Sequence, residues 1–544
     1  MGGAAHRAVE FGDGRRAVIA RAMWAAMLAP LALIPALGGA QQATHLVIPL
    51  APDTAWWSAV VVHGHRMPIR EGYTADLRAN TYGNQAQPLL LSNRGHVVWS
   101  DVAFTISATG GALRIEGTAP IEATRAGSTL RDAYLLASRR FFPFAGRMPD
   151  SLLFAAPQYN TWIELMYDQN QVDVLKYARG IRGHGLPPGV LMIDDNWQED
   201  YGRWRFHPGR FREPKAMVDS LHAMGFKVML WVCPFVSPDA DVYRELRRER
   251  LLLRDSSGEP AIVRWWNGAS ALLDLTNDGA RAWFTGQLDS LVHVYGVDGF
   301  KFDAGDAEFY RNTVASRSVS PNDHSALYGA VGLRYPLNEY RAMWRTGGQP
   351  LAERLRDKAH SWSDLALVVP HILAEGLAGY PFTAPDMIGG GEFTSFLDGK
   401  TIDQELVVRW AQASALMPMM QFSAAPWRVL DASHLESVMA VVRLRDHFRP
   451  YILSLARGAA STGEPIARAM EYAFPHRGYA EVRDQFLLGD RVLVAPVLAK
   501  GATRRSVLVP PGRWRAWTGS TVRGPRRIDV DAPLGVLPYF ERAD

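Results

Sequence analysis

The sequence predicts an α/β protein with a central (β/α)8 barrel. Short apolar runs recur along the middle of the chain, and each ends in an acidic or aromatic residue. These runs are 190–193, 227–230, 271–273 and 297–302, which precede Asp194, Trp231, Asp274 and Asp303. Segments with apolar residues at helical spacing lie between them, at 215–224 and 280–295. Such alternation over about 250 residues is typical of a parallel barrel, whose active site lies at the C-terminal ends of the strands.

A chain of 544 residues is too long for one compact unit, so we expect further domains on both sides of the barrel. The pattern of these flanking regions predicts that both are rich in β-strands. Short alternating strands with frequent Gly, Asn and Pro occur before the barrel, as at 45–50 and 113–116, and again after it, as at 492–497 and 507–514. We therefore expect a signal peptide at 1–40, an N-terminal β-sandwich domain at 41–154, the catalytic barrel at 155–455 and a C-terminal β-domain at 456–544.

The first 40 residues have the pattern of a secretory signal. Arg15, Arg16 and Arg21 precede an apolar run at 22–37, and the small residues 38–40 offer a cleavage site. The run contains two prolines and is shorter than the roughly 18 residues of a membrane-spanning helix. The sequence thus predicts a secreted or periplasmic protein without stable membrane insertion, or a membrane-anchored one if the signal stays uncleaved.

Composition limits the classes of ligand. A net charge of +4 is small for this length, so we expect no nucleic-acid partner. Cys233 is the single cysteine, which excludes an intramolecular disulfide. The histidines lack metal-ligand spacing and no Gly-rich phosphate loop occurs, so we expect neither a metal nor another cofactor. Nothing in the sequence indicates the oligomeric state.

The segment 297–306 carries the strongest chemical signal. Its apolar residues form a buried strand, while Lys301 and Asp303 cannot be buried unpaired and therefore face a common polar centre. Gly305 then allows a tight turn. Taken alone, the pair is equally consistent with a structural Lys–Asp pair that caps a barrel strand.

Several motifs in sequence order resemble glycoside hydrolase family 31, the retaining α-glycosidases. The nucleophile motif is resembled by residues 299–306, although Asp306 stands where many members carry Glu. The acid/base segment and the strand after it are resembled by 357–362 and 376–382. A sugar-binding Asp-x-x-Gly-Gly turn is resembled by 385–390. Segments 193–195, 230–232, 264–268, 300–305 and 380–382 most resemble the branch that contains the myogenesis-regulating glycosidase, which is associated with α-galactosidase activity. In this family an N-terminal β-domain packs on the barrel and can lend a loop to the site.

The resemblance implies residue roles. Asp303 is expected to be the nucleophile and Asp357 the acid/base, with Asp306 and Asp364 as alternatives for the second role; retaining chemistry needs the two carboxyl groups roughly 5 to 5.5 Å apart. The expected sugar contacts are Asp194, Asp195, Trp231, Trp265, Trp266, Lys301, Arg345 and Asp386, with Arg341 and Arg354 as alternatives to Arg345. Of the adjacent tryptophans, we expect one to be structural.

These roles predict hydrolysis of an oligosaccharide or glycoside at its non-reducing end by double displacement. Ser423 stands where most α-glucosidases of the family have a sugar-contacting His, so an α-galactoside is the favoured substrate. The alternatives are an α-glucoside, an α-xyloside, or a catalytically silent sugar-binding protein on the same barrel.

Overall fold

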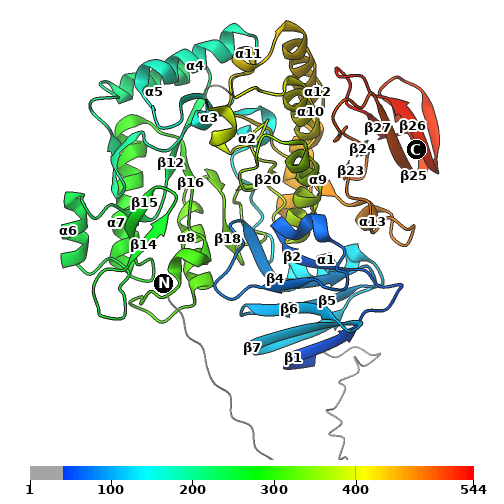
Figure 1. Cartoon of the computed structure of the whole chain (residues 1–544), viewed down its shortest axis with the longest axis horizontal. Coiled ribbons are helices and arrows are strands. Elements are labelled where there is room, and N and C mark those ends of the chain that lie inside the picture. Colours follow the sequence, from blue (N-terminus) through cyan, green and yellow to red (C-terminus); the bar gives the residue numbers. More distant parts are fainter. Residues whose placement is uncertain (1–40, 398–399) are drawn as a thin grey trace, which may run out of the picture.

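The computed structural model describes residues 41–544 except 398 and 399. The signal peptide expected at 1–40 lies outside the described residues. Figure 1 shows three parts: an N-terminal β-sheet domain in blue, a central barrel from cyan to yellow, and a C-terminal β-domain in orange and red on the opposite side of helix α12. The fold predicted from the sequence is confirmed.

The barrel is built from eight strands that run parallel in one sheet. In spatial order these are β20 (Thr383–Ala384), β19 (Glu353–Arg354), β17 (Leu337–Tyr340), β16 (Gly299–Phe302), β12 (Lys227–Val232), β9 (Val190–Ile193), β8 (Gln158–Asn160) and β21 (Gln421–Phe422). A parallel bridge between Met387 and Gln421 closes the ring after β20. The C-terminal strand ends, which carry the candidate site residues, therefore face one mouth.

Helices alternate with the barrel strands along the chain. They are α2 (Leu152–Ala155), α3 (Trp162–Leu165), α4 (Gln171–Gly183), α5 (Pro214–Ala223), α6 (Asp241–Arg248), α7 (Asp278–Ser290), α8 (Pro321–Gly332), α9 (Trp362–Leu377), α10 (Gln404–Ala415), α11 (Pro426–Val429) and α12 (Ala432–Thr462). Helix α5 shows why the sequence pattern works: Pro214 starts it without losing a hydrogen bond, and Met217, Val218 and Leu221 bury one face. Helix α7 continues into a π-helical turn, Leu291–Tyr295, so the helix predicted at 280–295 is confirmed.

One predicted barrel strand is wrong. The run 271–273 belongs to a small antiparallel sheet inserted between β12 and α7, with strand order β13 (Phe235–Val236), β15 (Gly268–Leu272) and β14 (Ile262–Trp265). Three apolar residues do not distinguish a barrel strand from a buried hairpin strand. Asp274 accordingly does not face the barrel axis; its carboxylate accepts hydrogen bonds from Thr276 and from the Ser316 amide.

The N-terminal domain pairs directly with a barrel loop. Its strands are β1 (Gln41–Pro49), β2 (Trp56–Val60), β3 (Thr74–Asp76), β4 (Gln85–Ser92), β5 (His96–Ser100), β6 (Phe104–Thr109) and β7 (Ala112–Arg125), followed by α1 (Leu130–Phe141). Strand β18 (Met343–Trp344), from the loop after β17, adds to this sheet beside β4. Just before β4, the Asn84 side chain donates to the carbonyl groups of Arg341 (2.7 Å) and Arg354 (3.1 Å). The domain thereby holds the backbone of two arginines near the barrel mouth.

The C-terminal domain is joined to the barrel through buried polar contacts. Its sheet has the order β22 (Ala467–Arg468), β23 (Phe486–Leu488), β24 (Val492–Val494), β27 (Tyr539–Arg542), β25 (Arg504–Ala516) and β26 (Thr521–Asp531), with helix α13 (Met470–Ala473) beside it. Arg409 of α10 donates to four carbonyl groups of this domain, including those of Ala502 and Ala532. No helix in the described part of the chain is long and apolar enough to span a bilayer.

Candidate active site

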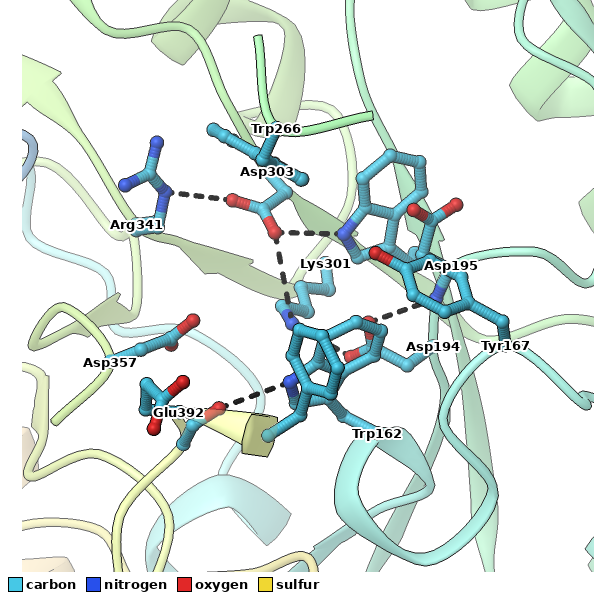
Figure 2. Close-up of a pocket in the computed structure, with 13 residues that line it drawn as sticks. Trp162, Tyr167, Asp194, Asp195, Trp266, Lys301, Asp303, Arg341, Asp357 and Glu392 are labelled. Atoms are coloured by element: carbon cyan, nitrogen blue, oxygen red, sulfur yellow. Dashed lines mark hydrogen bonds and ion pairs between the residues drawn. The ribbon is translucent and has the colours of Figure 1, made fainter. Parts of the chain in front are cut away.

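A cavity of about 360 Å³ opens at the C-terminal ends of the barrel strands. Figure 2 shows that acidic, basic and aromatic side chains converge on it. Its lining residues are Trp162, Tyr167, Asp194, Asp195, Trp231, Trp266, Lys301, Asp303, Arg341, Asp357, Gly391, Glu392 and Phe393. The structure thus brings together seven of the residues selected from the sequence: Asp194, Asp195, Trp231, Trp266, Lys301, Asp303 and Asp357.

Asp303 follows strand β16 and has donors on both oxygens. Its Oδ1 accepts from Arg341 Nε (2.9 Å) and from the Ala304 amide (2.8 Å), and its Oδ2 accepts from Trp231 Nε1 (2.8 Å). Burial alone would raise the pKa of Asp303, but the charges of Lys301 and Arg341 outweigh burial and hold that pKa well below its ordinary value. An ionised, oriented carboxylate therefore faces the cavity.

The backbone after Asp303 explains how the carboxylate is aimed. Ala304 and Gly305 both have left-handed backbone conformations, with φ of 57° and 79°. A Cβ on Gly305 would lie 2.3 Å from the Tyr328 ring, so only glycine fits there without displacing that ring. The tight turn predicted at this position is present.

Lys301 and Asp194 form a buried ion pair at the bottom of the site. Lys301 Nζ donates to Asp194 Oδ2 over 2.7 Å and lies 3.9 Å from Asp303 Oδ2. Burial lowers the pKa of Lys301, but the two carboxylates more than compensate and raise it. The lysine is therefore a fixed cation that links two acidic side chains.

Asp195 lies at the edge of the cavity, and we call Asp195 and the hydrogen-bonded side chains of Tyr167, Tyr201 and Asn267 the rim. Its Oδ2 accepts from Asn267 Nδ2 (2.5 Å) and from the Tyr201 hydroxyl (3.0 Å), and Asn267 Oδ1 accepts from the Tyr167 hydroxyl (2.7 Å). Burial raises the pKa of Asp195 to about 7, and the donated hydrogen bonds from Gln198 and Tyr201 oppose that rise. Asp195 thus connects the loop after β9 to the β14–β15 hairpin.

Asp357 lines the cavity from the loop after β19. Arg354 Nη1 donates to Asp357 Oδ1 over 2.6 Å, and the Asp357 side chain is 44% exposed while that of Arg354 is 1% exposed. The carboxyl group is therefore anchored from beneath and open to the cavity. In Figure 2, Asp357 and Asp303 lie in the same cavity, with Arg341 beside Asp303.

Aromatic residues that the sequence analysis did not select form part of the wall. The Trp162, Tyr167 and Phe393 rings pack edge to face, with centroids 5.3 to 6.1 Å apart. Trp266 lies on the other side, with its ring 4.7 Å from the Arg341 guanidinium. Trp162 starts helix α3 two residues after strand β8, whereas Tyr167 and Phe393 lie outside the barrel strands, and none of the three follows an apolar run like the one that precedes Trp231.

Three selected residues lie outside the lining. Arg345 donates to the Asp101 carbonyl, because β18 draws this segment toward the N-terminal sheet; Arg341, which directly follows β17, occupies the cavity instead. Trp265 is buried, stacks on Phe235 at 4.3 Å and donates to Ser270, so it is the structural member of the tryptophan pair.

Asp386 is the third of these residues, with no exposed surface. Its carboxylate accepts from Arg354 Nη1 (3.1 Å) and from the Lys358 amide (2.8 Å). Burial raises the pKa of Asp386 to about 7, against the opposing charge of Arg354. The expected direct sugar contact of Asp386 is not supported by this position.

Two alternatives for the acid/base also lie elsewhere. Asp306 pairs with Arg341 Nη2 over 2.5 Å, and Asp364 accepts from the Ala359 amide at the start of α9. Within residues 41–397 and 400–544, no group of three or more His, Cys, Asp or Glu side chains is arranged to hold a metal ion. Carboxylates, two fixed cations and aromatic faces in one barrel-mouth cavity define a site of the saccharide-processing type.

The comparisons with known proteins agree with this class. A model described as the glycosyl hydrolases family 31 TIM-barrel domain matches residues 148–455, and a model of the family's C-terminal domain matches 463–544. The chain therefore belongs to glycosyl hydrolase family 31, and the resemblance seen in its motifs is confirmed.

The chain is also similar to individual proteins, and its fold is similar to that of solved structures. The mouse (Mus musculus) myogenesis-regulating glycosidase is 36% identical over 76% of this chain and 60% of that protein, and alpha-glucosidase 2 of Bacillus thermoamyloliquefaciens is 25% identical over 80% and 57%. The chain thus spans about 60% of the length of these two relatives. A Flavobacterium johnsoniae dextranase structure matches the fold with a TM-score of 0.81 at 20% identity, covering 92% of this chain and 66% of that one. An alpha-xylosidase from a soil metagenome gives 0.80 at 21%, covering 92% and 79%.

Proposed function

We propose that this protein is a retaining α-glycosidase that removes a sugar from the non-reducing end of an α-linked saccharide or glycoside. The observation that carries the proposal is the pair of carboxyl groups in one cavity, Asp303 and Asp357, in different environments. Asp303 is held ionised by Lys301, Arg341 and Trp231, as a nucleophile requires. Asp357 is the more exposed of the two and lies where it can exchange protons with a leaving group and with water.

Under this proposal the reaction has two balanced steps. Asp303 Oδ attacks the anomeric carbon while Asp357 transfers its proton to the departing glycosidic oxygen, which gives a covalent glycosyl ester and a free alcohol. Asp357, now ionised, then takes a proton from water as that water attacks the anomeric carbon and the bond from that carbon to Asp303 Oδ breaks, which releases Asp303 as a carboxylate. The sugar leaves with its original anomeric configuration, and both carboxyl groups regain their starting states.

The favoured substrate is an α-galactoside. Ser423 stands where most family α-glucosidases present a His, and its hydroxyl accepts the Ile163 amide (2.7 Å) instead of reaching the cavity lining. The 36% identity to the myogenesis-regulating glycosidase supports the same branch. Relatives named for α-glucosides and α-xylosides make those sugars the alternatives.

The test is a panel of nitrophenyl α-galactoside, α-glucoside and α-xyloside, with the anomer of the first product read by NMR. Release of the α-anomer from any of them supports the retaining mechanism, and the preferred sugar names the substrate. We expect the α-galactoside to lead in kcat/KM by at least about tenfold, which is roughly 1.4 kcal/mol. Equal or better cleavage of the α-glucoside or α-xyloside contradicts the sugar assignment. No cleavage of any of them contradicts the enzymatic proposal.

A further inference from the structure

The turn after strand β20 is hydrogen-bonded to the loop that carries Asp357. Asp386, at the start of this turn, accepts the Lys358 amide through Oδ2 (2.8 Å), and the Glu392 amide donates to the Lys358 carbonyl (3.0 Å). The residue next to Asp357 is therefore held at both its N–H and its C=O. Such a clamp leaves the Asp357 backbone little freedom to move relative to β20.

The same turn also controls the side chain of Asp357 through Arg354. The Arg354 Nη1 group lies 2.6 Å from Asp357 Oδ1 and 3.1 Å from Asp386 Oδ1, and Arg354 Nε lies 3.2 Å from Glu339 Oε1. Arg354, Asp386 and Glu339 are each at most 1% exposed. Two buried acids thus fix the guanidinium that contacts Asp357.

The backbone conformation of Asp386 indicates that its place is determined by these contacts. Its φ is 70°, in the left-handed region that costs a non-glycine residue of order 1 kcal/mol. Gly391 closes the other side, because a Cβ there would lie 2.9 Å from Asp386 Oδ1 and 3.0 Å from Asp357 Oδ1. The two carboxyl groups are therefore separated by little more than the space of one missing methyl group.

We propose that Asp386 is a positioning residue for the proton donor Asp357 and not a sugar ligand. It holds the Lys358 amide with one oxygen and the Arg354 guanidinium with the other, and these two contacts set the position of the Asp357 carboxyl in the cavity. This inference rests on the proposed function, and it assigns Asp386 to proton transfer instead of to sugar recognition.

The test compares Asp386→Asn with wild type on two α-glycosides of the preferred sugar, one with an activated nitrophenyl leaving group and one with an unactivated alkyl or sugar leaving group. A poor leaving group needs the proton, whereas an activated one departs without it. We expect kcat/KM to fall at least about tenfold more for the unactivated substrate, with KM for the activated one changed less than about threefold.

Asp364→Asn is the matched control, because Asp364 accepts the Ala359 amide in the same loop and no contact between Asp364 and Arg354 is found among the described residues. We expect this variant to slow both substrates by similar factors. Gly391→Ala provides a second variant if Asp386→Asn does not fold. The added methyl group would lie 2.5 Å from Met387 Cε and 2.9 to 3.0 Å from one oxygen of each of the two carboxyl groups, so it is expected to disturb their arrangement and to give the same split.

An equal fall on both substrates, or a rise in KM alone, would assign Asp386 to sugar binding or to general support and overturn the inference. Failure of the proposed function is distinguishable, because wild type would then cleave neither substrate.

Discussion

Arg341 Nε donates to Asp303 Oδ1 over 2.9 Å, and the same guanidinium contacts Asp306 through Nη2. The two aspartates share one arginine but differ in the direction of their pKa shifts. The pKa of Asp303 is lowered because Lys301 and Arg341 outweigh burial, whereas burial raises the pKa of Asp306 to about 6, with further rises from Glu308 and Asp303. The two environments thus keep Asp303 ionised, whereas they raise the pKa of Asp306 to about 6.

Asp303→Asn is expected to abolish turnover while leaving the protein folded. The amide has the shape of the carboxylate but cannot form the glycosyl ester. The measurements are kcat/KM on the preferred nitrophenyl glycoside and the circular dichroism spectrum. A 2-fluoro or 5-fluoro glycoside should label Asp303 in wild type, as peptide mass spectrometry can show. Activity within about tenfold of wild type would reject Asp303 as the nucleophile.

Arg341→Gln should lower kcat/KM by about a hundredfold, because it removes a charge-assisted hydrogen bond from Asp303 and the cation beneath Trp266. Arg345→Gln is the matched control. Arg345 contacts the Asp101 carbonyl away from the cavity, so its loss is expected to change kcat/KM by less than about twofold. Equal losses in the two variants would indicate that neither arginine acts on the site directly.

The pKa of Asp306 predicts how stability depends on pH. A carboxyl group whose pKa is raised on folding contributes stability that is complete below its unfolded value, 3.8, and is lost as pH rises through about 6. Its protonated form contributes roughly 1 to 1.5 kcal/mol at pH 5 that is absent at pH 8. The free energy of unfolding of Asp306→Asn, measured by urea denaturation, should therefore improve relative to wild type between pH 5 and pH 8.

Asp303→Asn is the control for this measurement, because the pKa of Asp303 is shifted in the opposite direction to that of Asp306. The lowered pKa of Asp303 contributes stability that is present above the ordinary value and is lost only as pH falls toward the folded value. Its difference from wild type should stay nearly constant between pH 5 and pH 8. A trend in the same direction as that of Asp306→Asn would show that the two environments are not distinct.

The sequence was sufficient for the parts of the site that lie at the C-terminal ends of barrel strands. Asp194, Trp231 and Asp303 each come after an apolar run, and each lines the cavity. Local sequence pattern gave a wrong position where pairing with a distant part of the chain determines where a segment lies. Arg345 was expected in the site, but β18 pairs with the N-terminal sheet and carries it away.

Loops and short apolar runs were the other source of error. The run 271–273 has the composition of a barrel strand but pairs in an antiparallel hairpin. Tyr167 and Phe393 reach the cavity through chain folding that no local spacing encodes. Asp386 matched a family motif, yet its side chain points to Arg354 and the Lys358 amide because the turn places it behind the lining.

Asn267 joins three segments of the rim, and its removal should weaken substrate binding. Its amide donates to Asp195 and to the Tyr201 hydroxyl (2.9 Å), and it accepts from the Tyr167 hydroxyl. Asn267→Ala breaks all three contacts and releases the turn that carries Trp266 over the cavity. If the rim binds the sugar equally in the ground state and the transition state, as the proposed function implies, KM is expected to rise about tenfold while kcat changes less than about threefold.

Tyr167→Phe is the matched control for the rim, since it removes only the Tyr167 hydroxyl contact and keeps the ring packed on Trp162 and Phe393. We expect its KM to rise by a factor of about two to three, in keeping with one partly exposed hydrogen bond. Intrinsic tryptophan fluorescence should shift in Asn267→Ala and not in Tyr167→Phe, because only the first variant frees Trp266. If Asn267→Ala instead lowers kcat with KM unchanged, the rim acts on the chemical step and Asn267 supports the orientation of Asp195 rather than the position of Trp266.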